Sequence, residues 1–358
     1  MENNRDLNIE TEYQNYLYVR DRVIKMKQCG ASGYEGTNQP SDYWQEELVN
    51  FDYMMDASPL IVRKLRHHCY HLTGISIYDY RTNQHAGKRA FEAKLHALKA
   101  KDRNDLLIPE SRMLGGFGFE IDGQLYNIDT LKFYEALIAL DHVGILDRLR
   151  NAVERTLVCE IGGGWGGFAY QFKSLFPNIT YLIIDFPEVF LFSAVYLKTV
   201  FPNAHVLMYG DVPHEKTVQN WRNYDFIFVP NTFLDKMNPD KMDLVVNMVS
   251  FQEMTSAQVD KYTRKMSELG CPNLYSLNRE KSPYNDQLTS VSSIIGRYYK
   301  IREVKILRVS YAQTLGRRQI IEGAILEIAR KILRTIRKRP TSAYRHLVGQ
   351  LWSGSRTK

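Results

Sequence analysis

The stretch Glu160-Ile-Gly-Gly-Gly-Trp-Gly-Gly167 decides the fold of this chain of 358 residues. Apolar residues at 157–158 precede it and are typical of the end of a buried strand, whereas Phe168, Phe172 and Leu175 follow it with the spacing of one helix face. Glycines between a strand and a helix permit a tight turn and let a ligand approach the backbone. The pattern predicts an α/β fold with a parallel, Rossmann-like sheet and a ligand site at this turn.

The spacing of these glycines fits two kinds of ligand. Gly162, Gly164 and Gly167 satisfy the G-x-G-x-x-G pattern of dinucleotide-binding folds. Residues 160–166 satisfy E-x-G-x-G-x-G, which resembles the motif of class I S-adenosylmethionine-dependent methyltransferases. The carboxylate of Glu160 suits a ligand that carries a cationic sulfonium and an ammonium group, and suits a pyrophosphate poorly. We therefore expect S-adenosylmethionine rather than NAD as the cofactor.

An acidic residue ends the next predicted strand. Residues 180–184 are apolar, and Asp185 follows them 19 residues after Gly166. Folds of this kind place an acid about 20 residues beyond the glycine turn, on the ribose hydroxyls. Asp185, with its neighbour Phe186, is therefore predicted to contact the ribose. A role for Asp185 as a helix cap is compatible with this, because Pro187 suits a first helical position.

Two later segments compete for the role of the third strand. Residues 206–209 are followed by Asp211, and residues 226–229 are followed by Asn231. The side chain that follows the third strand is expected to meet the amino group of adenine, so Asp211 and Asn231 are both candidates.

Composition indicates a folded protein with a sizeable core. Hydrophobic residues make up 44% of the chain and aromatic residues 12%, which excludes a disordered chain. No apolar run reaches the roughly 18 residues of a membrane span, and residues 1–5 do not begin a signal peptide. We expect a cytoplasmic protein.

No metal site is indicated. The cysteines form no CxxC pair, and the histidines at 67 and 71 have no carboxylate or cysteine at ligand spacing. Nothing in the sequence indicates a Mg²⁺ requirement. The cysteines are Cys29, Cys69, Cys159 and Cys271.

The net charge of +7 is concentrated near the end of the chain. Nine of the 47 Lys and Arg residues lie between Arg330 and Lys358, where there is no Asp or Glu, and 38 basic residues face 40 acidic ones elsewhere. A nucleic-acid-binding face is therefore not expected. Residues 326–358 are predicted to form a basic amphipathic helix and a mobile tail. The helix either docks on the core or lies on the anionic inner face of a membrane.

Residues 1–150 are predicted to form a mainly helical domain, and residues 151–325 the cofactor-binding domain. In the first of these, Ser58 and Pro59 fit the start of a helix that ends at Gly74. The glycine-rich segment 108–119 is expected to be a loop that closes over the active site. The helical domain is a candidate substrate-binding, lid or dimerisation region, and the sequence leaves the oligomeric state open.

Residues 243–254 are a second candidate site. Residues 244–246 should form the strand beside the glycine-turn strand, so that the residues after them emerge at the switch point of the sheet. Ser250 and Glu253 fit a capping box, but Thr255 and Gln258 fit one too and are followed by a helical pattern. We therefore predict that 250–253 is a loop over the cofactor.

Four segments, 109–119, 160–166, 185–188 and 247–254, together resemble the sugar O-methyltransferases, a branch of the class I superfamily. The resemblance covers roughly residues 41–303. It implies methylation of a hydroxyl of a sugar, in a glycan or a glycosylated metabolite. The cofactor contacts that we predict are Glu160, Gly162, Gly163, Gly164, Gly166, Asp185, Phe186, Asp211, Asn231, Asn247 and Tyr126.

Methyl transfer to an alcohol also needs a base and groups that orient the acceptor. Glu253 is the first candidate for the base, with His142 and His214 as alternatives. The predicted substrate contacts are Arg112, Ser250 and Gln252. Two other functions stay open: an NAD-dependent sugar oxidoreductase or epimerase, and a non-catalytic partner subunit that binds the cofactor and docks on membrane-bound glycan enzymes.

Overall fold

The computed structural model describes residues 2–30, 35–81, 84–213, 216–281, 285–307 and 344–352, without the side chains of 2–8 and 29–30. Its centre is an eight-stranded sheet with the order β5-β6-β4-β3-β7-β8-β10-β9, in which β10 is antiparallel to both of its neighbours and the other pairs are parallel. The predicted α/β fold with a Rossmann-like sheet is confirmed. The strands are β3 (Thr156–Ile161), β4 (Ile179–Asp185), β5 (Val206–Met208), β6 (Phe226–Pro230), β7 (Leu244–Met248), β8 (Asn273–Asn278), β9 (Tyr299–Val304) and β10 (Arg345–Leu351).

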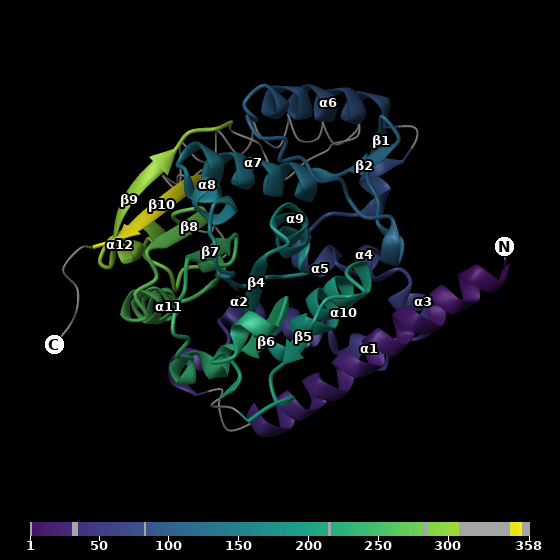
Figure 1. Cartoon of the computed structure of the whole chain (residues 1–358). Helices are drawn as coiled ribbons and strands as arrows, with labels where there is room; N and C mark the ends of the chain where they lie inside the picture. Colours follow the sequence, from purple (N-terminus) through teal and green to yellow (C-terminus); the bar gives the residue numbers. More distant parts are fainter. Residues whose placement is uncertain are drawn as a thin grey trace.

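Helices cover both faces of this sheet (Figure 1). Because successive side chains of a strand point to opposite faces, Val158 of β3 belongs to one apolar cluster and Leu157 and Cys159 to the other. The first face is covered by α7 (Ile128–His142), α8 (Ile145–Arg150), α9 (Gly167–Leu175) and α10 (Phe190–Val200), and the second by α11 (Ser256–Glu268) and α12 (Val291–Ile295).

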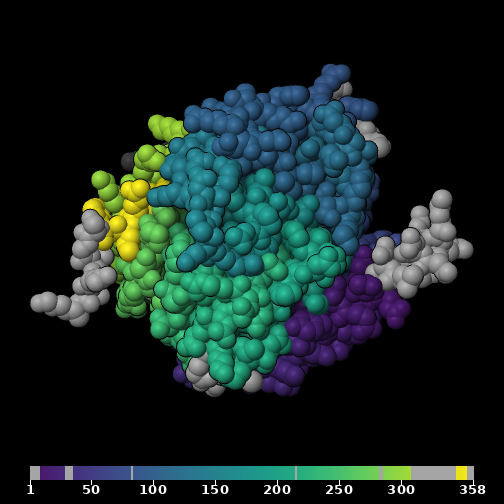
Figure 2. All heavy atoms as spheres, in the orientation of Figure 1, coloured from purple at the N-terminus to yellow at the C-terminus, as the bar shows by residue number. Residues whose placement is uncertain are grey.

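The region before the glycine turn is mainly helical and shares the first apolar cluster with the sheet. The long helix α1 (Glu2–Gly30) packs along α10, as the purple and teal atoms of Figure 2 show. A short hairpin joins β1 (Phe119–Ile121) to β2 (Gln124–Tyr126). The other helices here are α2 (Asp42–Val49), α3 (Pro59–Val62), α4 (Leu65–His68), α5 (Tyr70–Thr73) and α6 (His85–Lys99).

The end of the chain differs from the expected tail. Residues 345–351 form β10, which lies between β8 and β9 and completes the sheet. Leu347 and Val348 are buried in it, and the charge of Arg345 is paired with Glu280 and Glu303. The predicted basic helix lies outside the described residues. Within the described part of the chain, no helix combines the length and the apolar character that crossing a bilayer requires.

Candidate active site

A cavity lies at the carboxyl ends of β3, β4, β6 and β7, where the strand order reverses around β3. This is where ligands bind in open α/β sheets. The cavity holds about 1040 Å³ of space, including its opening to solvent. The predicted residues that line it are Glu160, Gly162, Gly163, Gly164, Asp185, Phe186, Asn231, Ser250 and Glu253.

The glycine turn forms the floor of this cavity. Gly162 has a φ of 74°, and a Cβ there would lie 2.1 Å from the hydroxyl oxygen of Ser250. Gly164 has a φ of 55°, and no heavy atom lies within 4 Å of the place that its Cβ would take. Glycine is therefore required at 162 by the neighbouring loop, and the space above 164 is open for a ligand.

Glu160 lines the wall of the cavity and is almost fully buried. The hydroxyl of Tyr181 donates a hydrogen bond of 3.0 Å to its carboxylate. Burial raises the pKa of Glu160 to about 8, and this hydrogen bond opposes the shift only in part. A cationic ligand beside this buried acid would lower its pKa and favour the ionised carboxylate.

Asp185 lies at the end of the adjacent strand and holds the turn. Its carboxylate accepts hydrogen bonds from the backbone N–H of Gly164 at 3.0 Å and of Phe186 at 2.8 Å. Burial raises the pKa of Asp185 to about 7, although these N–H donors lower it. The side chain therefore both fixes the turn and presents an acceptor to the cavity.

The strand order decides between the two candidates for the adenine contact. Both predicted segments are strands, but β6 lies next to β4, and β5 is displaced to the edge of the sheet. Asn231, after β6, lines the cavity, and its Nδ2 donates to the carbonyl of Asn38. Its Oδ1 is buried and accepts no hydrogen bond from any described residue. Asp211, after β5, lies outside the cavity and accepts hydrogen bonds from Tyr18 and Arg22.

The loop after β7 carries the candidate base. Val249 has a φ of 64°, a left-handed conformation that costs a β-branched residue about 1–2 kcal/mol. The turn leads into the short helix Phe251–Glu253, and the hydroxyl of Ser41 donates to the carbonyl of Glu253. Strain of this kind persists only where the surroundings enforce it and is common in active sites. The loop is therefore held in one position above the glycine turn.

Glu253 is half-buried and lies beside α2. Burial raises the pKa of Glu253 to about 8, the nearby Glu47 adds to the shift, and the charge of Lys132 and a hydrogen bond from the Trp44 side chain oppose it. An acid with a pKa in this range accepts a proton near neutral pH much better than an exposed carboxylate does.

Lys132 is the one cationic side chain among the described residues that line this cavity, and we did not predict it from the sequence. Its ammonium group lies 2.7 Å from the carboxylate of Asp129, in the first turn of α7. The other oxygen of Asp129 accepts from the indole N–H of Trp165, next to the glycines, at 3.0 Å. Asp129 thus ties Lys132 to the glycine turn.

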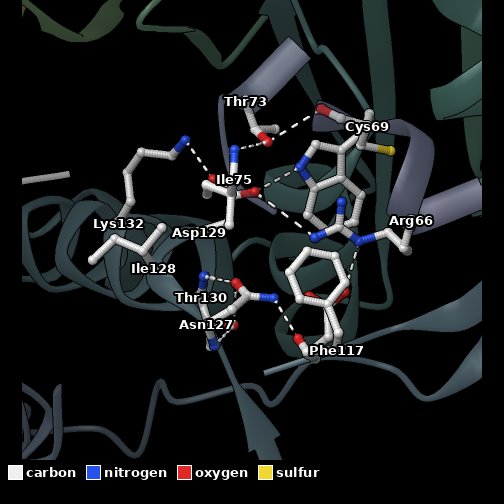
Figure 3. A network of polar contacts seen from close by, with 12 residues as sticks. Arg66, Cys69, Thr73, Ile75, Phe117, Asn127, Ile128, Asp129, Thr130 and Lys132 are labelled. Atoms are coloured by element: carbon white, nitrogen blue, oxygen red, sulfur yellow. Dashed lines mark hydrogen bonds and ion pairs between the residues drawn. The ribbon is translucent and has the colours of Figure 1, made fainter. Parts of the chain in front are cut away.

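The same carboxylate faces a buried arginine (Figure 3). The guanidinium of Arg66 stacks at 3.4 Å on the ring of Trp165 and donates at 2.6 Å to Glu110. Glu110 belongs to the segment that we expected to close over the active site. It packs instead behind the glycine turn, so this segment positions the turn from the rear and does not line the cavity.

A second cavity adjoins the first and holds about 1020 Å³ of space, including its opening to solvent. The two share Leu72, Thr73, Val249 and Glu253, so Glu253 lies at their junction. Most of the other side chains around it are polar or aromatic: Tyr43, Glu47, Tyr70, His71, Gln252, Arg279, Asn285 and Tyr344.

Several predicted residues have other positions. Gln252 lines the second cavity. Asn247 is buried behind the loop, where its side chain donates to the carbonyl of Ile161 and accepts from the N–H of Phe251. Gly166 is the N-cap of α9, with a φ of 84°.

Three other candidates line neither cavity. His142 is ten residues beyond Lys132 on α7, about 15 Å along the axis, and its ring contacts the carbonyl of Lys101. Arg112 donates to the carbonyl of Gly123 in the hairpin, and Tyr126 belongs to β2. The structure therefore does not bring these side chains to the site. His214 lies outside the described residues. No group of His, Cys, Asp and Glu that could hold a metal ion occurs among the residues described.

No protein-family model matches this chain, and no curated protein sequence matches it. Similar solved structures include phosphoethanolamine N-methyltransferase 2 of Haemonchus contortus with S-adenosyl-L-methionine, at 12% identity over 63% of this chain and 57% of that one, with a TM-score of 0.35. The bifunctional kinase-methyltransferase WbdD is 12% identical over 64% of this chain and 41% of its own, with a TM-score of 0.38. Magnesium protoporphyrin IX methyltransferase of Synechocystis PCC 6803, with bound S-adenosylmethionine, is 14% identical over 65% of this chain and 87% of its own, with a TM-score of 0.36.

This chain therefore spans little more than half of the first of these proteins and less than half of the second. At such identities and TM-scores, the similarities carry no inference about activity.

Proposed function

We propose that this chain is an S-adenosylmethionine-dependent O-methyltransferase that acts on a hydroxyl of a sugar, in a glycan or a glycosylated metabolite. The observation that carries the proposal is the position of Glu253, a half-buried acid at the junction of two cavities. One cavity has the glycine turn as its floor, and the other is lined by polar and aromatic side chains of the kind that bind sugars. A base between the cofactor and the acceptor accelerates methyl transfer to an alcohol.

The first cavity offers a partner for each part of this cofactor. Glu160 would hold the cationic methionine end, and the carboxylate of Asp185 would accept from the ribose hydroxyls. The buried Oδ1 of Asn231, which has no donor among the described residues, would accept from the amino group of adenine. Lys132 would pair with the carboxylate of the methionine end. An NAD pyrophosphate would instead meet the buried Glu160.

When bound, the cofactor supplies a methyl group that is already electrophilic. The protein must then hold the acceptor oxygen in line with that methyl group, a positional contribution that reaches several kcal/mol. Glu253 would accept the proton of the hydroxyl, which typically contributes about 10²–10⁴-fold. Ser250 and Gln252, on either side of the junction, would orient the neighbouring hydroxyls.

Calorimetry of the full chain with S-adenosylhomocysteine and with NAD tests the cofactor. We expect the first to bind and the second not to bind. NAD binding alone would instead support an oxidoreductase or epimerase. Labelled methyl transfer to glycan fractions then tests the reaction: cofactor binding with no transfer to any sugar would contradict the enzymatic proposal and leave a non-catalytic cofactor-binding subunit.

A further inference from the structure

The second cavity contains an arginine that pairs with no acid in the part of the chain that the structure describes. Arg279 follows β8 and is half-buried. Its guanidinium stacks on the ring of Tyr344, 4.6 Å from the ring centroid, and among the described residues it makes no hydrogen bond or ion pair. Other enclosed arginines of this structure have such partners: Arg66 pairs with Glu110 and Arg155 with Asp225.

The nearest acid in the sequence is not available to Arg279. Glu280 points the other way, where it accepts from the N–H of Ser292 and the hydroxyl of Ser290 and pairs with Arg345. Arg279 itself is held in place, because its backbone N–H donates at 3.0 Å to the side-chain carbonyl of Gln252. Among the described residues, the guanidinium donors therefore have no hydrogen-bond acceptor, and the ring of Tyr344 packs against the guanidinium plane.

The two acidic residues that line this cavity, Glu47 and Glu253, both act on Tyr43. Burial has the largest effect in raising the pKa of Tyr43, which lies on α2, and the charges of Glu253 and Glu47 raise this pKa further. The charges that act most on Glu253 are those of Lys132, Glu47 and Asp185. The cavity thus has an acidic part beside Glu253 and a basic part at Arg279.

We propose that the second cavity binds an acidic sugar, with a carboxylate or phosphate group held by Arg279 and the reacting hydroxyl directed toward Glu253. The inference rests on the function proposed above and specifies its acceptor. A guanidinium matches both anions because its planar donors form two parallel hydrogen bonds to them. The stacked ring of Tyr344 keeps that plane oriented.

Calorimetry of the protein saturated with S-adenosylhomocysteine tests this inference with three probes: methyl glucuronide, glucose 1-phosphate and methyl glucoside. We expect at least one of the anionic sugars to bind about tenfold or more tightly than the neutral one. The anion that shows the stronger preference distinguishes a carboxylate from a phosphate acceptor.

Variants assign the preference to one side chain. Arg279→Gln should abolish it, and Arg279→Lys should keep part of it, because lysine keeps the charge but loses the paired geometry. Arg302→Gln, which removes an exposed arginine of β9, is the matched control and should have no effect. Equal binding of the three probes, no binding of any of them, or a preference that survives in Arg279→Gln would overturn the inference. Failure of the wild-type chain to bind S-adenosylhomocysteine would instead contradict the proposed function.

Discussion

At the scale of single residues, burial controls the chemistry of the site. Burial raises the pKa values of Glu160, Asp185 and Glu253 to about 8, about 7 and about 8. For Glu160 the ordinary value is 4.5, so the folded state keeps a proton that the unfolded chain releases. The free energy of unfolding therefore falls as the pH rises from the ordinary value to the raised one. A bound cation would reverse this loss.

This gives a test of the charge at position 160. Because Glu160 must ionise to attract a sulfonium, the affinity for S-adenosylmethionine relative to its neutral-sulfur product should increase between pH 6 and pH 9. We expect a change of about tenfold, or about 1.4 kcal/mol, and Glu160→Gln should remove it. The measurement is calorimetric titration of both ligands across this range. An affinity ratio that is independent of pH in the wild-type chain would argue against contact between Glu160 and the sulfonium.

A second residue-scale prediction concerns the base. Glu253→Gln keeps the shape of the side chain but cannot accept a proton, so turnover should fall by about 10²–10⁴-fold, with cofactor affinity unchanged. In the wild-type chain, kcat/KM should rise as the pH increases through about 8, the pKa of Glu253 without ligands. Steady-state kinetics across pH would show both effects. Full activity of Glu253→Gln would remove Glu253 as the base.

At the scale of elements, local rules were reliable and long-range pairing was not. The capping box of Thr255 and Gln258, the N-cap of Ser58 and the left-handed Gly74 are confirmed, because each depends on atoms a few residues apart. The single helix predicted between Ser58 and Gly74 is wrong, since this segment is divided into α3, α4 and α5. The order β5-β6-β4 was not predictable, since both candidate strands have similar composition and their positions depend on pairing across the sheet. This order separates Asn231 from Asp211.

The loop after β7 supports a prediction at this scale. Val249→Gly should remove the cost of holding a β-branched residue in the left-handed conformation, about 1–2 kcal/mol. The added entropy of glycine in the unfolded chain costs roughly 0.5–1 kcal/mol, so the two effects at least balance. Thermal denaturation should therefore show an equal or higher Tm. Turnover should decrease because the freed loop holds Glu253 less firmly. A clear loss of stability would mean that the valine side chain, rather than the backbone conformation, supports the loop.

At the scale of the whole molecule, cavity and sheet both depend on segments far apart in the sequence. Lys132, Trp44 and Tyr344 come from three separate regions and line the cavities beside the glycine turn. No motif marks them, because their role depends only on the folded position. The strand β10 also depends on distant segments: its pairing partners in β9 and β8 lie about 40 to 80 residues earlier in the sequence. A short run beside a basic segment is, by itself, typical of a tail.

The packing of β10 gives the last prediction. Gly349 lies against Tyr299 of β9, and a Cβ there would be 2.8 Å from the Cβ of the tyrosine. Because both atoms belong to paired strands, neither moves easily. Gly349→Ala should therefore cost roughly 1–3 kcal/mol of stability, as overpacking does. Gln350→Ala, at the next and exposed position of the same strand, should cost little. Chemical denaturation of the two variants measures the difference. Equal stabilities would show that β10 does not pair with β9 in this register.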